Sequence, residues 1–118
     1  MDSRGVSPEE FLRMALALPE VELNDSREQW TGVKVRGKGF CYLSEAEAAA
    51  HVKTTREEQQ AMIAENPEVF GPSWSGGRFG WVAVRLAGAD PQELAELVTE
   101  AWRLTAPRRL VASFEARP

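Results

Sequence analysis

The stretch VKVRGKGFCYL, residues 33–43, decides the fold that this chain is expected to adopt. Apolar and basic side chains alternate at its start, two glycines flank a lysine in its middle, and an apolar run ends it. Alternation with a period of two is typical of a half-buried strand, and glycine supplies the backbone freedom that a tight turn requires. The stretch therefore predicts a β-hairpin in which Val33 and Val35 face a core, while Lys34 and Arg36 face away from it.

A second hairpin is predicted over residues 69–86. Its two arms, 69–74 and 79–86, are joined by Ser-Gly-Gly-Arg, and a Gly-Gly pair permits the positive φ angles that short hairpin turns need. Between the two hairpins, a turn after Ser44 is expected to lead into a strand over 49–53. Strands that follow one another in pairs favour an antiparallel sheet.

Three segments carry the start and stop signals of helices. Each begins with Ser, Thr or Asp followed three residues later by Glu, and continues with apolar residues at helical spacing. The predicted helices span residues 7–18, 55–65 and 90–104. Acidic residues gather in their first turns, where the helix macrodipole favours negative charge. Much of the negative charge of the chain therefore has a structural explanation.

These elements predict an α+β fold of order α-β(3)-α-β(2)-α, in a single domain over residues 1–118. Helices would cover one face of an antiparallel sheet, in two layers, and the other face would stay open. By the same alternation, Val82 and Val84 face the core, whereas Trp81 and Arg85 lie on the open face. The open face is expected to be basic and partly aromatic.

The composition is that of a soluble globular domain without a catalytic motif. Of its 118 residues, 43% are hydrophobic and 27% are charged, and no apolar stretch is long enough to span a membrane. His51 has no second histidine at metal-ligand spacing, and Cys41, the single cysteine, cannot form an internal disulfide. The first residues lack the apolar run of a signal peptide. We therefore expect a cytoplasmic protein with no membrane contact, no cofactor, no metal site and no enzymatic activity.

Five blocks of the chain, taken in order, resemble the MmcQ/YjbR family of small bacterial proteins. They lie at residues 18–21, 33–40, 66–70, 77–82 and 100–110, and the resemblance extends from about residue 7 to residue 112. It implies the YjbR-like fold, an antiparallel sheet with helices on one side, in the same order that the spacing predicts. It also implies a DNA-binding protein in which two β-hairpins act as wings.

Carried over to this sequence, the resemblance makes the basic residues of the hairpins candidates for contact with DNA phosphates. The candidates are Lys34, Arg36 and Lys38 in the first hairpin, Arg78 and Arg85 in the second, and Arg108 and Arg109 after the last helix. Trp74 and Trp81 flank the second turn and are candidates for stacking on a base or another ligand. The net charge of −4 argues against a protein that wraps nucleic acid over its whole surface. No recognition helix with base-reading side chains is visible, so we expect any DNA binding to be non-specific.

Two other functions stay open at this point. In one, the open sheet face binds a protein or a peptide as a small non-enzymatic adaptor, with the chain itself a monomer or a weak homodimer. In the other, Trp74, Arg78 and Trp81 surround a small-ligand pocket in which the arginine holds an anion.

Overall fold

The computed structural model of the chain describes residues 5–25 and 30–116. Its strands are β1 (Val21–Asp25), β2 (Trp30–Val35), β3 (Lys38–Ser44), β4 (Ala49–Thr55), β5 (Phe70–Gly76) and β6 (Phe79–Arg85). Its helices are α1 (Pro8–Leu16), α2 (Arg56–Glu65), α3 (Pro91–Thr105) and α4 (Arg108–Glu115), with a short 3₁₀ helix, η1 (Leu86–Gly88), before α3.

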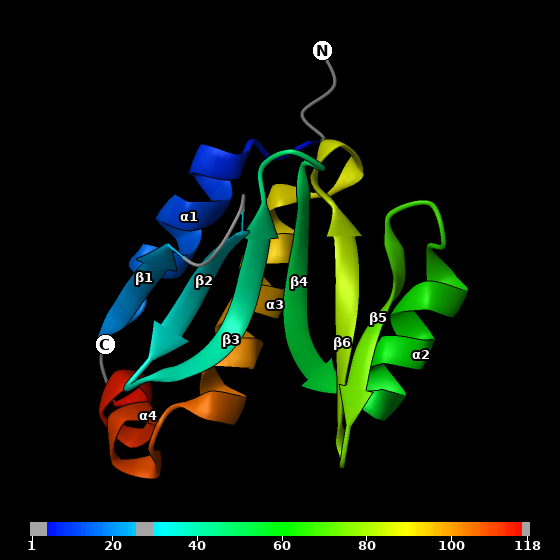
Figure 1. The fold of residues 1–118 in the computed structure, drawn as a ribbon. Helices are drawn as coiled ribbons and strands as arrows, with labels where there is room; N and C mark the ends of the chain where they lie inside the picture. The colour runs from blue at the N-terminus through cyan, green and yellow to red at the C-terminus, as the bar shows by residue number, and fades with distance from the viewer. Residues whose placement is uncertain (1–4, 26–29, 117–118) are drawn as a thin grey trace.

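The strands form an antiparallel sheet in the order β1-β2-β3-β4-β6-β5. Figure 1 is viewed onto one face of this sheet, with α1 and α3 behind it and α2 beside β5. The predicted α+β class, with helices packed against an antiparallel sheet, is confirmed. None of the described helices is long and apolar enough to cross a membrane.

The three predicted helices begin where their capping signals lie. Ser7 accepts a hydrogen bond from the backbone N–H of Glu10, and the Glu10 carboxylate accepts one from the backbone N–H of Ser7. Thr55 and Asp90 cap α2 and α3 through the same side-chain contact to the residue three positions on. These contacts satisfy N–H groups that the helices themselves leave without a partner.

Two elements lie outside the predicted order. The strand β1 extends the sheet by pairing with β2, with Val21 opposite Val35. The helix α4 follows α3 and is held by an edge-to-face contact between the rings of Trp102 and Phe114, 5.0 Å apart. Its start lacks a side-chain cap, and two arginines occupy its first turn, where the macrodipole disfavours them. Tertiary packing therefore stabilises α4 where local signals do not.

The first hairpin turns one residue earlier than its glycines suggest. Arg36 and Gly37 form the turn with φ angles of 51° and 81°, and β3 already begins at Lys38. A bulge then leaves Phe40 as an extra residue opposite Val33, since Val33 pairs with Cys41 and the next pair joins Lys34 to Gly39. The prediction that Arg36 lies on a strand is therefore wrong, because Arg36 is a turn residue, but its side chain is exposed and points away from the core as predicted.

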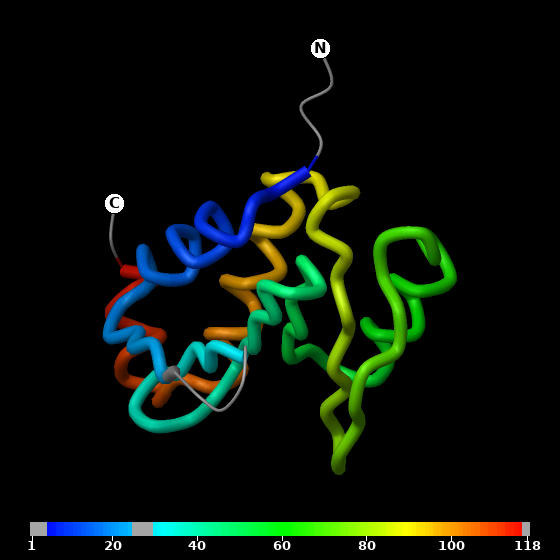
Figure 2. The backbone as a smooth tube through the Cα atoms, turned by 45° about the horizontal axis from the view of Figure 1, so that its top comes forward, coloured from blue at the N-terminus to red at the C-terminus, as the bar shows by residue number. Residues whose placement is uncertain are grey.

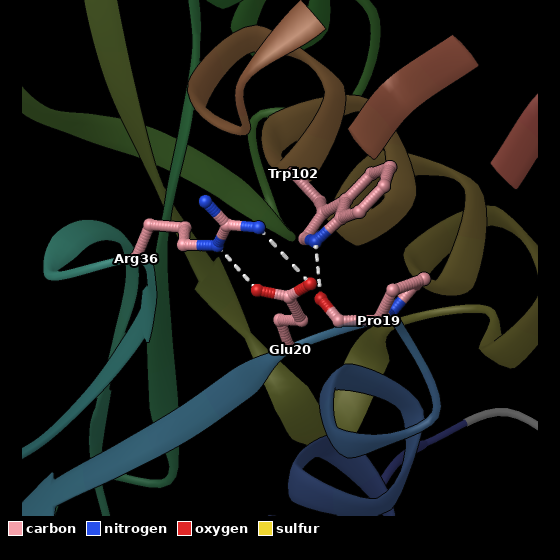
Figure 3. A network of polar contacts seen from close by, with 4 residues as sticks. All are labelled: Pro19, Glu20, Arg36 and Trp102. Carbon is pink, nitrogen blue, oxygen red and sulfur yellow. Dashed lines mark hydrogen bonds and ion pairs between the residues drawn. The ribbon is translucent and has the colours of Figure 1, made fainter. Parts of the chain in front are cut away.

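The core lies between one sheet face and the helices. The four valines that alternation assigns to the core, Val33, Val35, Val82 and Val84, are all fully buried. Trp102 of α3 is also fully buried, and its indole N–H donates a hydrogen bond of 3.0 Å to the carbonyl of Pro19 (Figure 3). This bond ties the main helix of the core to the segment that joins α1 to β1.

The helix α2 packs closely on the same side of the sheet because β6 carries glycine at the point of contact. Gln59 of α2 donates a hydrogen bond of 2.7 Å to the carbonyl of Trp81. A Cβ atom at Gly80 would lie 2.7 Å from Gln59 Oε1 and 3.1 Å from Gln59 Cβ. The glycine is therefore required by the approach of the helix and not only by the nearby turn.

We predict that Gly80→Ala destabilises the protein by about 1–3 kcal/mol, because an added methyl group overpacks this contact and displaces Gln59. The matched control is Gly71→Ala on the neighbouring strand, where a Cβ would meet nothing within 4 Å. Urea unfolding of both variants measures the difference. Equal unfolding midpoints for the two variants would contradict this account of the α2 contact.

Candidate nucleic-acid interface

Strand pairing determines which side chains share the open face. Tyr42 lies opposite His51, His51 lies opposite Ala83, and Lys53 lies opposite Trp81. Because these positions alternate with the buried valines, their side chains point away from α3. The strands β2 to β6 contain no Asp or Glu, while they carry Lys34, Lys38, Lys53 and Arg85. The charged side chains of these five strands are therefore all positive, with Lys34, Lys53 and Arg85 on the open face and Lys38 directly opposite the buried Val35 at the end of the sheet.

Three rings, which we call the aromatic row, lie side by side on the open face, from β3 to the edge strand β5. They are Tyr42 on β3, Trp81 on β6 and Trp74 on β5, with centroids 5.5 Å apart for the first pair and 5.9 Å apart for the second. A bulge in β5 between Pro72 and Ser75 places Trp74 beside Trp81. The two tryptophans that the sequence singled out therefore pack on each other.

The two tryptophans of the row differ in exposure. Trp81 is only 7% exposed although it lies on the open side, whereas Trp74 is 60% exposed. Among the described residues, the buried Nε1 of Trp81 has no hydrogen-bond partner. A buried donor without a partner costs about 1–3 kcal/mol. The row thus combines an exposed ring with a buried donor that has no partner among the described residues.

A second group, which we call the basic cluster, lies at the end of the sheet where both hairpins turn. It consists of Lys38 at the start of β3, Lys53 near the end of β4 and Arg78 in the β5–β6 turn. Burial lowers the pKa of Lys53, and the charges of Lys38 and Arg78 lower it further. Lys53 Nζ lies 4.3 Å from the ring centroid of Phe79, and the Arg78 guanidinium lies 5.1 Å from it.

Register explains why residues distant in sequence meet there. Val35 pairs with Lys38 at one hairpin turn, and Thr55 pairs with Phe79 beside the other. The β5–β6 hairpin reaches past the rest of the sheet at this end (Figure 2). Lys53 is not among the residues predicted to contact DNA. The predicted strand 49–53 does hold a signal for it, because Lys53 lies two residues after His51 and so on the same face of the strand.

The other predicted basic residues are spread over the molecule. Arg36 forms an ion pair with Glu20 (Figure 3), with a second contact of 3.2 Å from Nη2 to Oε2, and this pair raises the pKa of Arg36 and lowers that of Glu20. Arg85 lies at the opposite end of β6 and donates to the carbonyl of Glu68. Lys34 is half-buried on the open face of β2. Arg36 is thus neutralised by Glu20 although it lies in the turn beside Lys38, Arg85 lies at the far end of the sheet, and Lys34 is not among the charges that lower the pKa of Lys53.

Arg108 and Arg109 are exposed in the first turn of α4, on the helical side of the molecule. A shallow groove of about 570 Å³ connects the end of α3 to the second hairpin turn. Its lining residues are Thr55, Arg56, Glu57, Arg78, Phe79 and Leu104. The end of α3 therefore lies near Arg78 of the basic cluster, and the two arginines of α4 come shortly after this end of α3.

Glu57 lines the groove beside Arg78 and Glu20 pairs with Arg36, but several other acidic side chains lie at the opposite end of the sheet. They include Glu45 and Glu47 in the β3–β4 turn and Asp90 and Glu93 at the start of α3. The N–H of Leu86 in η1 donates to the carbonyl of Ala48, which joins the two regions. A net charge of −4 is thus compatible with a basic end.

Two residues considered for chemistry have other surroundings. Cys41 is fully buried, and burial raises the pKa of its thiol well above its ordinary value, so it is a protonated core residue. His51 Nδ1 and Ser73 Oγ share a hydrogen bond of 2.6 Å, and the His51 ring lies edge-on to Trp30, 5.0 Å away. Within the described residues, no group of three His, Cys, Asp or Glu side chains is placed to hold a metal ion.

A sequence model of the YjbR family matches residues 16–104. The chain belongs to the YjbR family. The match spans β1 to β6 and α2, together with nearly all of α3, so it includes every strand of the sheet and both the aromatic row and the basic cluster.

Two proteins similar to this YjbR protein are both named as uncharacterized proteins. One, from Mycobacterium bovis, and one, from Mycobacterium tuberculosis, are each 41% identical to it over 56 residues. The alignment covers 48% of this chain and 43% of each relative, so less than half of either protein is compared. The crystal structure of Deinococcus radiodurans protein DR2400, a DUF419 domain, has the same fold, with a TM-score of 0.74 and 16% identity. That match covers 83% of this chain and 77% of the other.

The surroundings of His51 predict a pH dependence of stability. Burial lowers its pKa from the ordinary value of 6.5, and the charge of Glu47 opposes this only in part. The folded protein therefore disfavours the protonated ring, and this residue's contribution to stability is lost as the pH falls through 6.5. We expect the wild type to lose more stability between pH 7.5 and pH 5 than His51→Gln, as measured by urea unfolding.

The carboxylates whose pKa the fold lowers, Glu10 and Glu20, also reduce stability in acid. They are present in both proteins, so their effect cancels in the comparison. Equal losses in the wild type and in His51→Gln would show that the fold tolerates the protonated ring.

Proposed function

We propose that this YjbR protein binds DNA non-specifically, through phosphate contacts made by the basic cluster. The observation that carries the proposal is that Lys53 and Arg78 meet at the ring of Phe79, while Lys38 begins the neighbouring strand β3 at the same end of the sheet. In the described part of the chain, none of the three forms an ion pair with a carboxylate. Cations that are close together and unpaired are suited to a polyanion.

The pKa of Lys53 supports the same proposal. Its ammonium group is partly buried and lies near two other positive charges, and both effects disfavour the charged form. A phosphate placed among the three groups would favour that form again and would relieve their mutual repulsion. Binding of an anion is therefore expected to be linked to the charge state of this lysine.

The proposal modifies the role of the two hairpins. Arg36 is engaged by Glu20, and Arg85 lies at the far end of its strand. The expected contacts are therefore made where the two hairpins turn, with Lys53 between them, and not along the length of two separate wings. Arg108 and Arg109 would extend the contacts on the helical side. Contacts of this kind fix position on the backbone and read little sequence.

We predict micromolar binding to a fluorescein-labelled random duplex at about 50 mM salt, measured by fluorescence anisotropy. Three phosphate contacts would weaken the affinity by about 40-fold between about 50 and 200 mM salt, because the logarithmic slope is about −0.9 for each contact. The double variant Lys38→Glu/Arg78→Glu is expected to bind at least about ten-fold more weakly than the wild type.

The matched control is Arg13→Glu/Arg85→Glu, which changes the net charge equally but alters exposed arginines outside the basic cluster. It should bind the duplex with an affinity close to that of the wild type. If both double variants weaken binding equally, only the net charge matters and the basic cluster is not the site. No binding to the duplex at low salt would reject the proposed duplex contact.

A further inference from the structure

We infer that the open face takes single-stranded DNA, with bases stacked on Trp74 and the backbone phosphates held by the basic cluster. This inference rests on the proposed function and adds the substrate class. Contact with phosphates alone gives the aromatic row no role. We assign to it the contact with bases.

The first argument is the position of the rings relative to the cations. Lys53 of the basic cluster lies directly opposite Trp81 of the aromatic row, on the neighbouring strand. A ligand that crosses from one group to the other must offer both negative charge and flat apolar surface. A single strand offers both, because its bases are free to unstack, whereas a duplex hides the faces of its bases within its own stack.

The second argument is the state of the two tryptophans. Trp74 is 60% exposed and rests against a neighbour that is almost fully buried. The ring is held in place by the bulge in β5, so it presents a flat surface at little entropic cost. The buried Nε1 of Trp81, which has no described partner, is a donor within the same row.

The third argument is charge complementarity, which favours a nucleic acid over a peptide. The five strands that carry the aromatic row and its surroundings contain no carboxylate side chain. The nearest acidic position in the sheet is Glu22 on the edge strand β1, opposite Lys34. Carboxylates reach the open face beside its centre, at Glu22 opposite Lys34 and at Glu47 near His51. A surface whose strands β2 to β6 carry rings and cations fits a phosphate polymer better than an ordinary peptide of mixed charge.

The test compares a labelled oligothymidylate of about 15 nucleotides with a duplex of the same length, at one salt concentration. We expect the single strand to bind the wild type at least about five-fold more tightly. Trp74→Leu should weaken binding of the single strand by about ten-fold, within the range measured for loss of one stacked base. It should change binding of the duplex by less than about two-fold. Trp74→Phe, which keeps a ring, should restore most of the affinity for the single strand.

The outcomes separate this inference from the proposed function. If Lys38→Glu/Arg78→Glu weakens binding of both nucleic acids while Trp74→Leu changes neither, the phosphate site stands and the stacking surface is rejected. Single-strand binding that depends on Trp74 without any duplex binding would support the open face and reject the duplex contact.

Two further results would overturn the inference. One is that an abasic strand, which has phosphates but no bases, binds as tightly as the oligothymidylate. Stacking would then have no role in binding. The other is tighter binding of oligouridylate than of oligothymidylate, because the preferred ligand would then be RNA. Far-ultraviolet circular dichroism and urea unfolding of each variant establish that it is folded before binding is compared.

Discussion

The antiparallel pairing of β4 with β6 in the middle of the sheet is the constraint on which the rest of the structure depends. It places Val52 opposite Val82 on the face that the helices cover, and Lys53 opposite Trp81 on the face that they leave open. A slip of one residue would exchange these two faces. Helices cover only one side, so the same register that builds the core also gathers rings and cations on the other.

Much of the fold could be predicted from the sequence because its signals are local. The caps at Ser7, Thr55 and Asp90 mark helix starts, and the glycine-rich segments mark hairpins. The strand β1 and the helix α4 could not be predicted in this way. The helix lacks a capping side chain, and its position depends on Phe114 meeting the ring of a distant tryptophan.

The candidate site could be predicted only in part, because its geometry depends on contacts between distant segments. Lys38 and Arg78 were identified as basic turn residues, but only the register brings Lys53 between them. The pairing of Arg36 with Glu20 depends on the path of the chain after α1, which no local pattern encodes. Trp81 was assigned to the open side, but its burial depends on the bulge that brings Trp74 against it.

The central claim is that nucleic acid lies on the open face, between the aromatic row and the basic cluster. The most direct measurement is a ¹H–¹⁵N spectrum of the labelled protein, with and without an oligothymidylate. The account predicts shifts of the indole N–H of Trp81 and of backbone amides around Lys53 and Trp74. The indole N–H of Trp102, which is bonded to Pro19 in the core, should stay unchanged and serves as an internal reference. Shifts confined to α1 and α3, or no shifts at all at saturating oligonucleotide, would contradict it.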